Sequence, residues 1–276
     1  MYVGVDIGGS KTLIAVLDKN GRIVEQTKFP TPADYDTFIT TVAEALAELT
    51  NKDFQAAGIA VPGKLNRIEG IGLVFGNLNW HDVAIQADFE KLLACPVVIE
   101  NDANLAALSE SMLLKDYEKV LYVTISTGIG TGVVSNRTID PLFADSEGGQ
   151  MPLEHNGKFE IWEDFASGHA IVERFGKKAE DITDEATWRR IAHDWSYGFI
   201  QLIALIQPSI IVLGGSVGVY FDRYEAYLKD ELDVFNNPLV PIPPIVQAAR
   251  PELAVIYGCY DLARSKYVYL LSLIHI

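Results

Sequence analysis

The sequence predicts an α/β protein built of two lobes with a ligand cleft between them. Segments with the pattern of strands alternate with segments of helical periodicity along most of the chain. The opening run of strand, glycine turn and strand returns near half-chain distance, where Gly128 takes the place of Gly8. The chain has 276 residues, enough for about two domains. Duplicated α/β halves that face one another leave a cleft in which ligands tend to bind.

The first half is predicted to hold short strands joined by tight turns and helices. Asn20-Gly21 is a strong hairpin signal, because both turn positions need a positive φ. Phe38, Val42 and Leu46 recur at helical spacing and predict the first helix. The expected strands are 2–7, 12–18, 23–29, 58–61 and 97–99, and the expected helices are 33–49, 82–93 and 103–114.

The second half repeats this pattern around a turn at 126–130. Trp188, Trp195 and Phe199 belong to one apolar stripe of a long helix, which predicts a buried face. The expected strands are 119–125, 131–135 and 209–213, the helices are 163–175, 185–206 and 218–232, and 236–244 is a loop. We expect an N-terminal domain at 1–118, onto which a C-terminal helix at about 259–276 packs, and a second domain at 119–258.

Charge and cysteine content exclude several classes of protein. Lys plus Arg number 22 and Asp plus Glu 37, so the net charge is −15 and nucleic acid or membrane surfaces are not expected as partners. Cys95 and Cys259 form no CxxC or CxC pair, which argues against a disulfide framework and a cysteine zinc site. The opening MYVGVDIGG lacks the pattern of a signal peptide, and no apolar run has the length of a membrane span. We therefore expect a cytoplasmic protein.

Two glycine-rich turns are candidate phosphate sites. A carboxylate, two glycines and three donors follow the first strand, as Asp6, Gly8, Gly9, Ser10, Lys11 and Thr12. Backbone N–H groups beside glycine can approach a phosphate closely, although a plain hairpin explains the same residues. The run 126–132 has three glycines at spacing two, and the strand that follows it disfavours a dinucleotide fold. Two such turns, each after a strand, favour one shared phosphate site.

Two further strand ends carry candidate functional groups. Glu100, Asn101 and Asp102 directly follow the buried strand 97–99. Asp102 could be a helix N-cap, or its carboxylate could accept the proton of a hydroxyl, and the sequence leaves both possibilities open. Gly214-Gly215 lies between a strand and a helix, where glycines either form a plain turn or permit the flat approach of a purine ring.

Together these motifs resemble the ROK family of sugar kinases, in the actin-like ATPase superfamily with its ribonuclease H-like fold. The resemblance runs in order along nearly the whole chain. The matching segments are DIGGSK at 6–11, VPG at 61–63, NLNW at 77–80, ENDAN at 100–104, STGIGTG at 126–132, EGGQ at 147–150, WEDFASG at 162–168, LGG at 213–215 and the closing segment 249–263.

The resemblance implies roles for individual residues, with ATP and Mg²⁺ as cofactors. Asp102 would be the catalytic base, and Asp6 would lie near Mg²⁺, through water. The implied ATP contacts are Gly8, Gly9, Ser10, Lys11, Thr12, Thr127, Gly128, Gly130, Gly214 and Gly215. The implied sugar contacts are Gly63, Asn77, Asn101, Asp102, Glu147, Gln150 and Glu163.

One segment departs from the family pattern. Many members have a histidine where this chain has Gln150, and three cysteines soon after it, which together bind a structural zinc. Residues 150–159 contain no cysteine, and His155 alone cannot hold a zinc that needs about four ligands. We therefore expect no structural zinc, while Gln150 can still donate and accept hydrogen bonds toward a sugar.

The expected activity is the phosphorylation of a hexose hydroxyl, with glucose converted to glucose 6-phosphate as the first choice. Two glutamates with Asn-Asp suit equatorial hydroxyls, but N-acetylmannosamine, N-acetylglucosamine and fructose stay open. The alternative from another class is a sugar-responsive transcription repressor, which the charge and a first strand that starts at Tyr2 disfavour. A third alternative is a non-catalytic, sugar-binding regulator of the same family. A homodimer is possible, and the donor could be ATP or polyphosphate.

Overall fold

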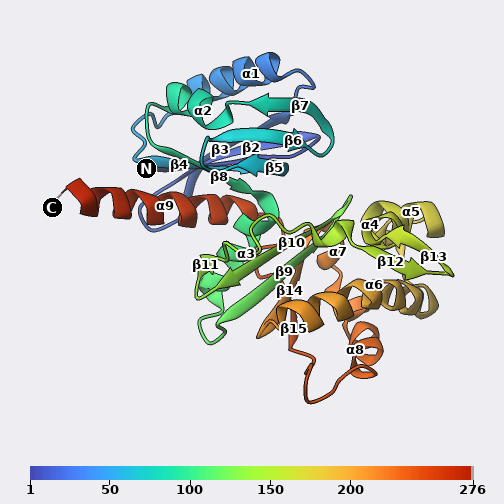
Figure 1. Ribbon diagram of the computed structural model, residues 1–276. Coiled ribbons are helices and arrows are strands. Elements are labelled where there is room, and N and C mark those ends of the chain that lie inside the picture. Colours follow the sequence, from blue (N-terminus) through green and yellow to red (C-terminus); the bar gives the residue numbers. More distant parts are fainter. Residues whose placement is uncertain (275–276) are drawn as a thin grey trace. The chain divides into compact units, whose positions relative to one another are not determined.

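The computed structural model describes residues 1–274, and the side chains of residues 1–267. The chain divides into two compact units, Met1–Ser109 with Leu253–Ile276, and Glu110–Glu252 (Figure 1). The sequence analysis expects the domain boundaries after 118 and after 258, several residues later than the limits of these units, after 109 and after 252. That domain assignment stays a prediction. The last helix begins at Ala254 rather than at about 259, and residues 275–276 of its predicted range fall outside the described residues.

The first unit is built on a five-stranded sheet with the order β3-β2-β1-β4-β8. Its strands are β1 (Tyr2–Ile7), β2 (Lys11–Leu17), β3 (Ile23–Pro30), β4 (Ala56–Val61) and β8 (Val97–Asn101). The first three form the predicted antiparallel meander, whereas β1, β4 and β8 are parallel. The carboxyl ends of these parallel strands therefore meet at one edge, where Asp6 lies opposite Ala60 and Ala60 opposite Glu100.

Helices cover both faces of this sheet. Figure 1 shows α1 (Tyr35–Glu48) and α2 (Ile85–Leu93) on one side of it and α9 (Ala254–Ile274) on the other. Phe38 of α1 and Phe89 of α2 are fully buried in one core with the strands. On the opposite face α9 approaches β4 so closely that a Cβ on Gly58 would collide with the backbone carbonyl of Cys259. Glycine in β4 is what permits this contact.

A small second sheet in this unit was not predicted. Its strands are β5 (Gly63–Asn66), β6 (Ile71–Phe75) and β7 (Leu78–Val83), all antiparallel. The helix predicted at 82–93 begins only at Ile85, because Val83 still pairs with Gly72 of β6. The buried Trp80 ties this sheet to the chain before α1, since its Nε1 donates to the carbonyl of Ala33 at 2.9 Å.

The second unit has a sheet of similar design, in the order β11-β10-β9-β14-β15. Its strands are β9 (Lys119–Ile125), β10 (Ile129–Ser135), β11 (Thr138–Ile139), β14 (Ile210–Gly214) and β15 (Ile245–Gln247). An antiparallel pair, β9 and β10, is again extended by parallel strands, β14 and β15. Because β10 begins at Ile129 rather than at 131, Gly130 lies in a strand and not in the turn where the sequence analysis puts it.

The helices of the second unit correct two predictions. The helix predicted at 163–175 is two, α4 (Trp162–Ala166) and α5 (Gly168–Phe175), because the extended Ser167 caps α5 by accepting a hydrogen bond from the N–H of Ala170 at 3.2 Å. The range 218–232 contains the end of α7 (Gly215–Gly218), a short 3₁₀ turn and most of α8 (Glu225–Asp233). The apolar stripe of α6 (Glu185–Ile206) is buried, as predicted.

Between β11 and α4 the chain forms a 3₁₀ turn (Gly148–Gln150) and a hairpin of β12 (Pro152–His155) and β13 (Lys158–Ile161), none of which the sequence predicts. A further 3₁₀ turn spans Ala179–Asp181. The predicted loop at 236–244 contains only an isolated bridge, between Asn237 and Val240. Within the described part of the chain, every helix is too short or too polar to cross a lipid bilayer.

Candidate functional site

Two carboxylates stand at the carboxyl edge of the sheet in the first unit. Asp6 is near the end of β1, and Asp102 follows β8 as the first residue of α3 (Asp102–Leu113). Burial raises the pKa of Asp6 to about 7, an effect to which the negative charge of Asp102 adds and which Lys28 reduces. Burial also raises the pKa of Asp102, against the lowering effect of the N–H of Ala103. Such shifts toward neutral pH are typical of functional carboxylates.

Asn101, rather than Asp102, caps helix α3. Its Oδ1 accepts hydrogen bonds from the N–H of Ala103 at 2.9 Å and of Asn104 at 3.3 Å, while its Nδ2 donates to the carbonyl of Gly63 at 3.3 Å. Oδ1 of Asp102 accepts the Ala103 N–H at 2.8 Å, and its Oδ2 has no hydrogen bond to another residue among residues 1–267, whose side chains the structure describes. The helix therefore has its cap without Asp102, and one oxygen of Asp102 stays available as a base.

A buried salt bridge fixes the end of β8 beneath these residues. The carboxylate of Glu100 accepts from Nε of Arg67 at 2.7 Å, from Nδ2 of Asn104 at 3.0 Å and from the N–H of Asn101 at 2.8 Å. Arg67 follows β5 and was not identified from the sequence. Glu100 could have indicated such a partner, because a carboxylate placed directly after a buried strand needs a cation beside it.

The turn between β1 and β2 exposes Gly9, Ser10 and Lys11. The N–H of Gly8 closes the turn onto the carbonyl of Lys11 at 3.0 Å. Thr12 points inward instead: it is fully buried, and its hydroxyl lies 2.9 Å from that of Thr31, which in turn donates to the carbonyl of Gly8 at 2.7 Å. The side chain of Thr12 therefore braces the turn.

Asn77 lies directly beside this turn. It is exposed between β6 and β7, and a Cβ on Gly9 would come within 3.1 Å of the Cβ of Asn77. Gly63 belongs to the same small sheet and has a φ of +126°, with its α-carbon close to the carbonyl of Val74. The unpredicted sheet thus brings both of these predicted sugar contacts to the edge where Asp6 and Asn101 stand.

In the second unit, Glu163 joins the glycine turn to Gln150. Its Oε2 accepts the N–H of Ile129 at 3.1 Å and would be 2.7 Å from a Cβ on Gly128. Its Oε1 accepts a hydrogen bond from Nε2 of Gln150 at 2.5 Å. Three predicted site residues from separate motifs, Gly128, Gln150 and Glu163, are therefore neighbours.

The segment 147–150 packs on β10 through its two glycines. The N–H of Gly148 donates to the hydroxyl of Thr131 at 3.0 Å, and a Cβ on Gly149 would collide with the carbonyl of Ile129. Both glycines are buried, whereas Glu147 and Gln150 on either side are exposed. This packing presents the two predicted sugar contacts to solvent at the surface of the second unit.

Glycine is required at 214 and 215 by the protein's own packing. A Cβ on Gly214 would collide with the hydroxyl of Tyr122, and Gly215 has a φ of +80°, where a Cβ would lie 2.6 Å from Oγ1 of Thr124. The turn 126–128 is likewise fixed by a hydrogen bond to the start of α5, since the carbonyl of Ser126 accepts the N–H of Gly168 at 2.7 Å. These strand ends can bring a ligand close to the backbone, as expected for glycine.

The donor set of the first unit fits Mg²⁺. The carboxylate of Asp6 has no hydrogen bond or ion pair among residues 1–267, whose side chains the structure describes, and its negative neighbour Asp102 would favour a cation. Mg²⁺ commonly takes one or two carboxylates together with phosphate oxygens and water. Among the described residues, there is no group of three or more His, Cys, Asp or Glu that could hold a metal ion by itself.

The zinc ligands of the family pattern do not fit this chain. His155 is buried, and both of its ring nitrogens are engaged with carboxylates. Cys95 and Cys259 both belong to the first unit, and both are buried free thiols. The expectation that the protein binds no structural zinc stays a prediction for the purified protein.

Solved structures share this fold. A ROK family glucokinase from Streptomyces griseus, in complex with glucose and AMPPNP, is 24% identical with a TM-score of 0.82, over 96% of this chain and 99% of that one. The inorganic polyphosphate/ATP-glucomannokinase from Arthrobacter sp. strain KM is 25% identical with a TM-score of 0.75, over 96% and 98%. The fold is that of the actin-like ATPases, as the sequence predicts.

Sequence comparison then gives the family. The model of the ROK family matches residues 2–266, so the chain belongs to the ROK family. It is 25% identical over 313 residues to the glucokinase of Streptomyces coelicolor, which covers 96% of this chain and 98% of that protein. It is also 25% identical over 265 residues to the fructokinase of Streptococcus mutans, over 89% of each. These relationships identify the chain as a phosphotransferase.

Proposed function

We propose that the chain is an ATP- and Mg²⁺-dependent kinase that phosphorylates glucose at its C6 hydroxyl. The observation that carries the proposal is the free Oδ2 of Asp102, at the end of a parallel strand in a helix start that Asn101 already caps. A carboxylate that has a raised pKa and one oxygen without a hydrogen bond to another residue suits a general base. The kinase relatives over nearly the full chain support the same assignment.

In the proposed reaction, Asp102 accepts the proton of the sugar hydroxyl as its oxygen attacks the γ-phosphorus of ATP. The bond from that phosphorus to the β–γ bridging oxygen breaks, and ADP leaves. Phosphoryl transfer demands mainly positioning and stabilisation of charge from a protein. Mg²⁺, when bound near Asp6, would offset negative charge on the phosphates.

The other predicted contacts divide by chemistry. Backbone N–H groups of the turns at Gly8–Gly9 and Thr127–Gly128, with Ser10, Lys11 and Gly130, would bind phosphates, and Gly214-Gly215 would flank the adenosine. Hydroxyls of the sugar would be bound by Asn101, Glu147, Gln150 and Glu163, with Gly63 and Asn77 lining the pocket. Carboxylate and amide groups are the usual partners of such hydroxyls.

The substrate is tested with purified protein, Mg²⁺ and ATP by coupled detection of ADP. Glucose is compared with fructose, N-acetylglucosamine and N-acetylmannosamine, and polyphosphate replaces ATP in a parallel series. We expect the highest kcat/KM with glucose and ATP. A higher kcat/KM with another sugar would replace glucose and keep the kinase, whereas sugar binding without any turnover would favour the non-catalytic regulator.

Two further parts of the proposal concern the setting of the enzyme. We place it in the cytoplasm, where ATP is available, and we expect that it has no nucleic acid partner, because its net charge of −15 repels phosphate backbones. A gel-shift measurement at low salt checks the second point. Sedimentation at several concentrations shows whether the chain forms a homodimer.

A further inference from the structure

The hairpin of β12 and β13 connects two of the proposed sugar contacts. Gln150 precedes β12, and Glu163 follows β13 in the first turn of α4. At the base of the hairpin, the N–H of Trp162 donates to the carbonyl of Met151 at 2.9 Å. A displacement of the hairpin would therefore also displace Gln150 and Glu163.

The hairpin is anchored to the rest of the second unit mainly by its side chains. Its two strands pair only with each other, and a two-stranded sheet is marginally stable by itself. Phe159 on β13 is 78% exposed, so it contributes little apolar burial. The side chains that do anchor the hairpin include Leu153 and His155, both buried.

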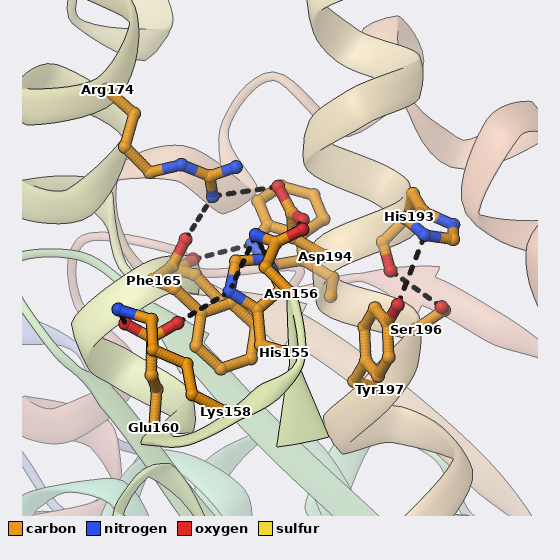
Figure 2. Close-up of polar contacts among 12 residues, drawn as sticks. His155, Asn156, Lys158, Glu160, Phe165, Arg174, His193, Asp194, Ser196 and Tyr197 are labelled. Carbon is orange, nitrogen blue, oxygen red and sulfur yellow. Dashed lines mark hydrogen bonds and ion pairs between the residues drawn. The ribbon is translucent and has the colours of Figure 1, made fainter. Parts of the chain in front are cut away.

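His155 docks the far end of β12 onto two helices. Its ring stacks on Phe165 of α4, with the centroids 4.0 Å apart and the planes at 7°. Nδ1 lies 2.9 Å from Oε2 of Glu160, and Nε2 lies 3.2 Å from Oδ1 of Asp194 on α6 (Figure 2). A carboxylate therefore faces each ring nitrogen, and Nδ2 of Asn156 lies 3.3 Å from Nδ1 and 3.1 Å from Nε2.

Besides His155, each of these two carboxylates contacts a lysine or an arginine. Nζ of Lys158 lies 2.7 Å from Oε1 of Glu160, and Nη1 of Arg174 on α5 lies 2.8 Å from Oδ2 of Asp194. Figure 2 shows these contacts as one connected group. Polar contacts run through the series Lys158, Glu160, His155, Asp194 and Arg174, which we call the charge clamp. Hydrogen bonds from Lys158 and His155 lower the pKa of Glu160.

We propose that the charge clamp positions Gln150 and Glu163 for the sugar, with His155 as the positioning residue. The clamp joins β12 and β13 to α5 and α6 through the contacts of His155 with Asp194 and of Asp194 with Arg174. It would supply by side-chain charges the rigidity that this loop needs to present two polar groups in a fixed geometry. The inference rests on the proposed function, because it assigns the hairpin to the binding of sugar.

The test compares His155→Gln with His193→Gln in the full-length protein. His193 is a matched control: it lies on α6, pairs with Glu231 at 2.9 Å, and its side chain is 55% exposed. For His155→Gln we expect the sugar KM to rise about fivefold or more, with the ATP KM within about twofold, since only the sugar contacts are displaced. His193→Gln should leave both constants unchanged.

A second measurement does not depend on activity. Hydrogen exchange of the amides at 153–161 should accelerate about tenfold or more in His155→Gln and not in the control variant, because the hairpin opens locally more often. Asp194→Asn should also accelerate it, and the acceleration in the double variant should be smaller than the product of the two single accelerations, since the variants share the contact between His155 and Asp194.

The outcomes separate the clamp from the proposed function. Unchanged exchange at 153–161 in both single variants overturns the clamp, whatever the kinetic constants are. Faster exchange with an unchanged sugar KM overturns the positioning role. If the unaltered protein phosphorylates none of the sugars, the proposed function fails and with it the positioning role, while the exchange data still decide whether the clamp holds the hairpin.

Discussion

The carboxylates of Asp6 and Asp102 are close enough that the charge of Asp102 helps raise the pKa of Asp6 to about 7. They come from strand ends at opposite sides of β4 in the sheet order, and parallel pairing aligns those ends. Two such groups cannot both be ionised without cost unless a cation or a proton lies between them. This relationship underlies the first two predictions.

Replacing Asp102 by Asn should abolish most activity without unfolding the protein. The amide cannot accept the hydroxyl proton, so kcat should fall by about 10² or more, a common effect of losing a general base. The melting temperature should change little, because Asn101 keeps the cap of α3. Asp116→Asn, at an exposed position beyond the same helix, is the control. Near-normal turnover in the folded variant would remove Asp102 from the mechanism.

Replacing Asp6 by Asn should stabilise the protein at alkaline pH while it lowers activity. The pKa of Asp6, about 7 against an ordinary 3.8, means that the folded state keeps a proton which the unfolded chain has lost between those values. The free energy of unfolding therefore falls as pH rises through this window, and the loss is complete above it. At pH 8 the variant should be more stable by about 1–3 kcal/mol.

Thermal unfolding of both proteins at several pH values checks this sign. The difference in melting temperature between Asp6→Asn and the unaltered protein should be largest at pH 8 and vanish near pH 4. A constant difference across this range, or a less stable variant at pH 8, contradicts the assignment. Activity with Mg²⁺ and ATP should fall in the variant at every pH.

Glu163→Gln should weaken sugar binding selectively. A charge-assisted hydrogen bond contributes about 1.5–3 kcal/mol, so the sugar KM should rise roughly tenfold or more while the ATP KM barely changes. The melting temperature should also drop somewhat, because Gln cannot accept from both Ile129 and Gln150 with two oxygens. Asp164→Asn, the exposed neighbour on α4, controls for a change of charge in this helix. A lower melting temperature with an unchanged sugar KM would leave Glu163 a purely structural residue.

The purified protein should contain no stoichiometric zinc. His155 is engaged by Glu160 and Asp194, and residues 150–159 contain no cysteine. Chelators of zinc should therefore leave the melting temperature unchanged, whereas activity should still require added Mg²⁺. Elemental analysis that finds about one tightly bound zinc per chain would contradict this prediction.

Local patterns predicted most of the regular elements. The meander of β1, β2 and β3 follows from its turns at Gly8-Gly9 and Asn20-Gly21, and the long helix α6 from a buried aromatic stripe. The sheet of β5, β6 and β7 was missed, because its strands are short and only partly buried, and only β7 opens with clean alternation. The break at Ser167 was missed as well, because a helix-capping hydroxyl lies within an otherwise continuous helical pattern.

The sequence by itself determined which groups are available: Asp6, Asp102, the glycine turns and the family to which they point. Only the tertiary structure decided how they are used. It assigned the cap of α3 to Asn101, turned Thr12 inward, and joined Glu163 to Gln150 and Ile129. Residue type and spacing fix the local backbone, but hydrogen bonds between distant segments form only when packing brings those segments together, and no local pattern contains that information.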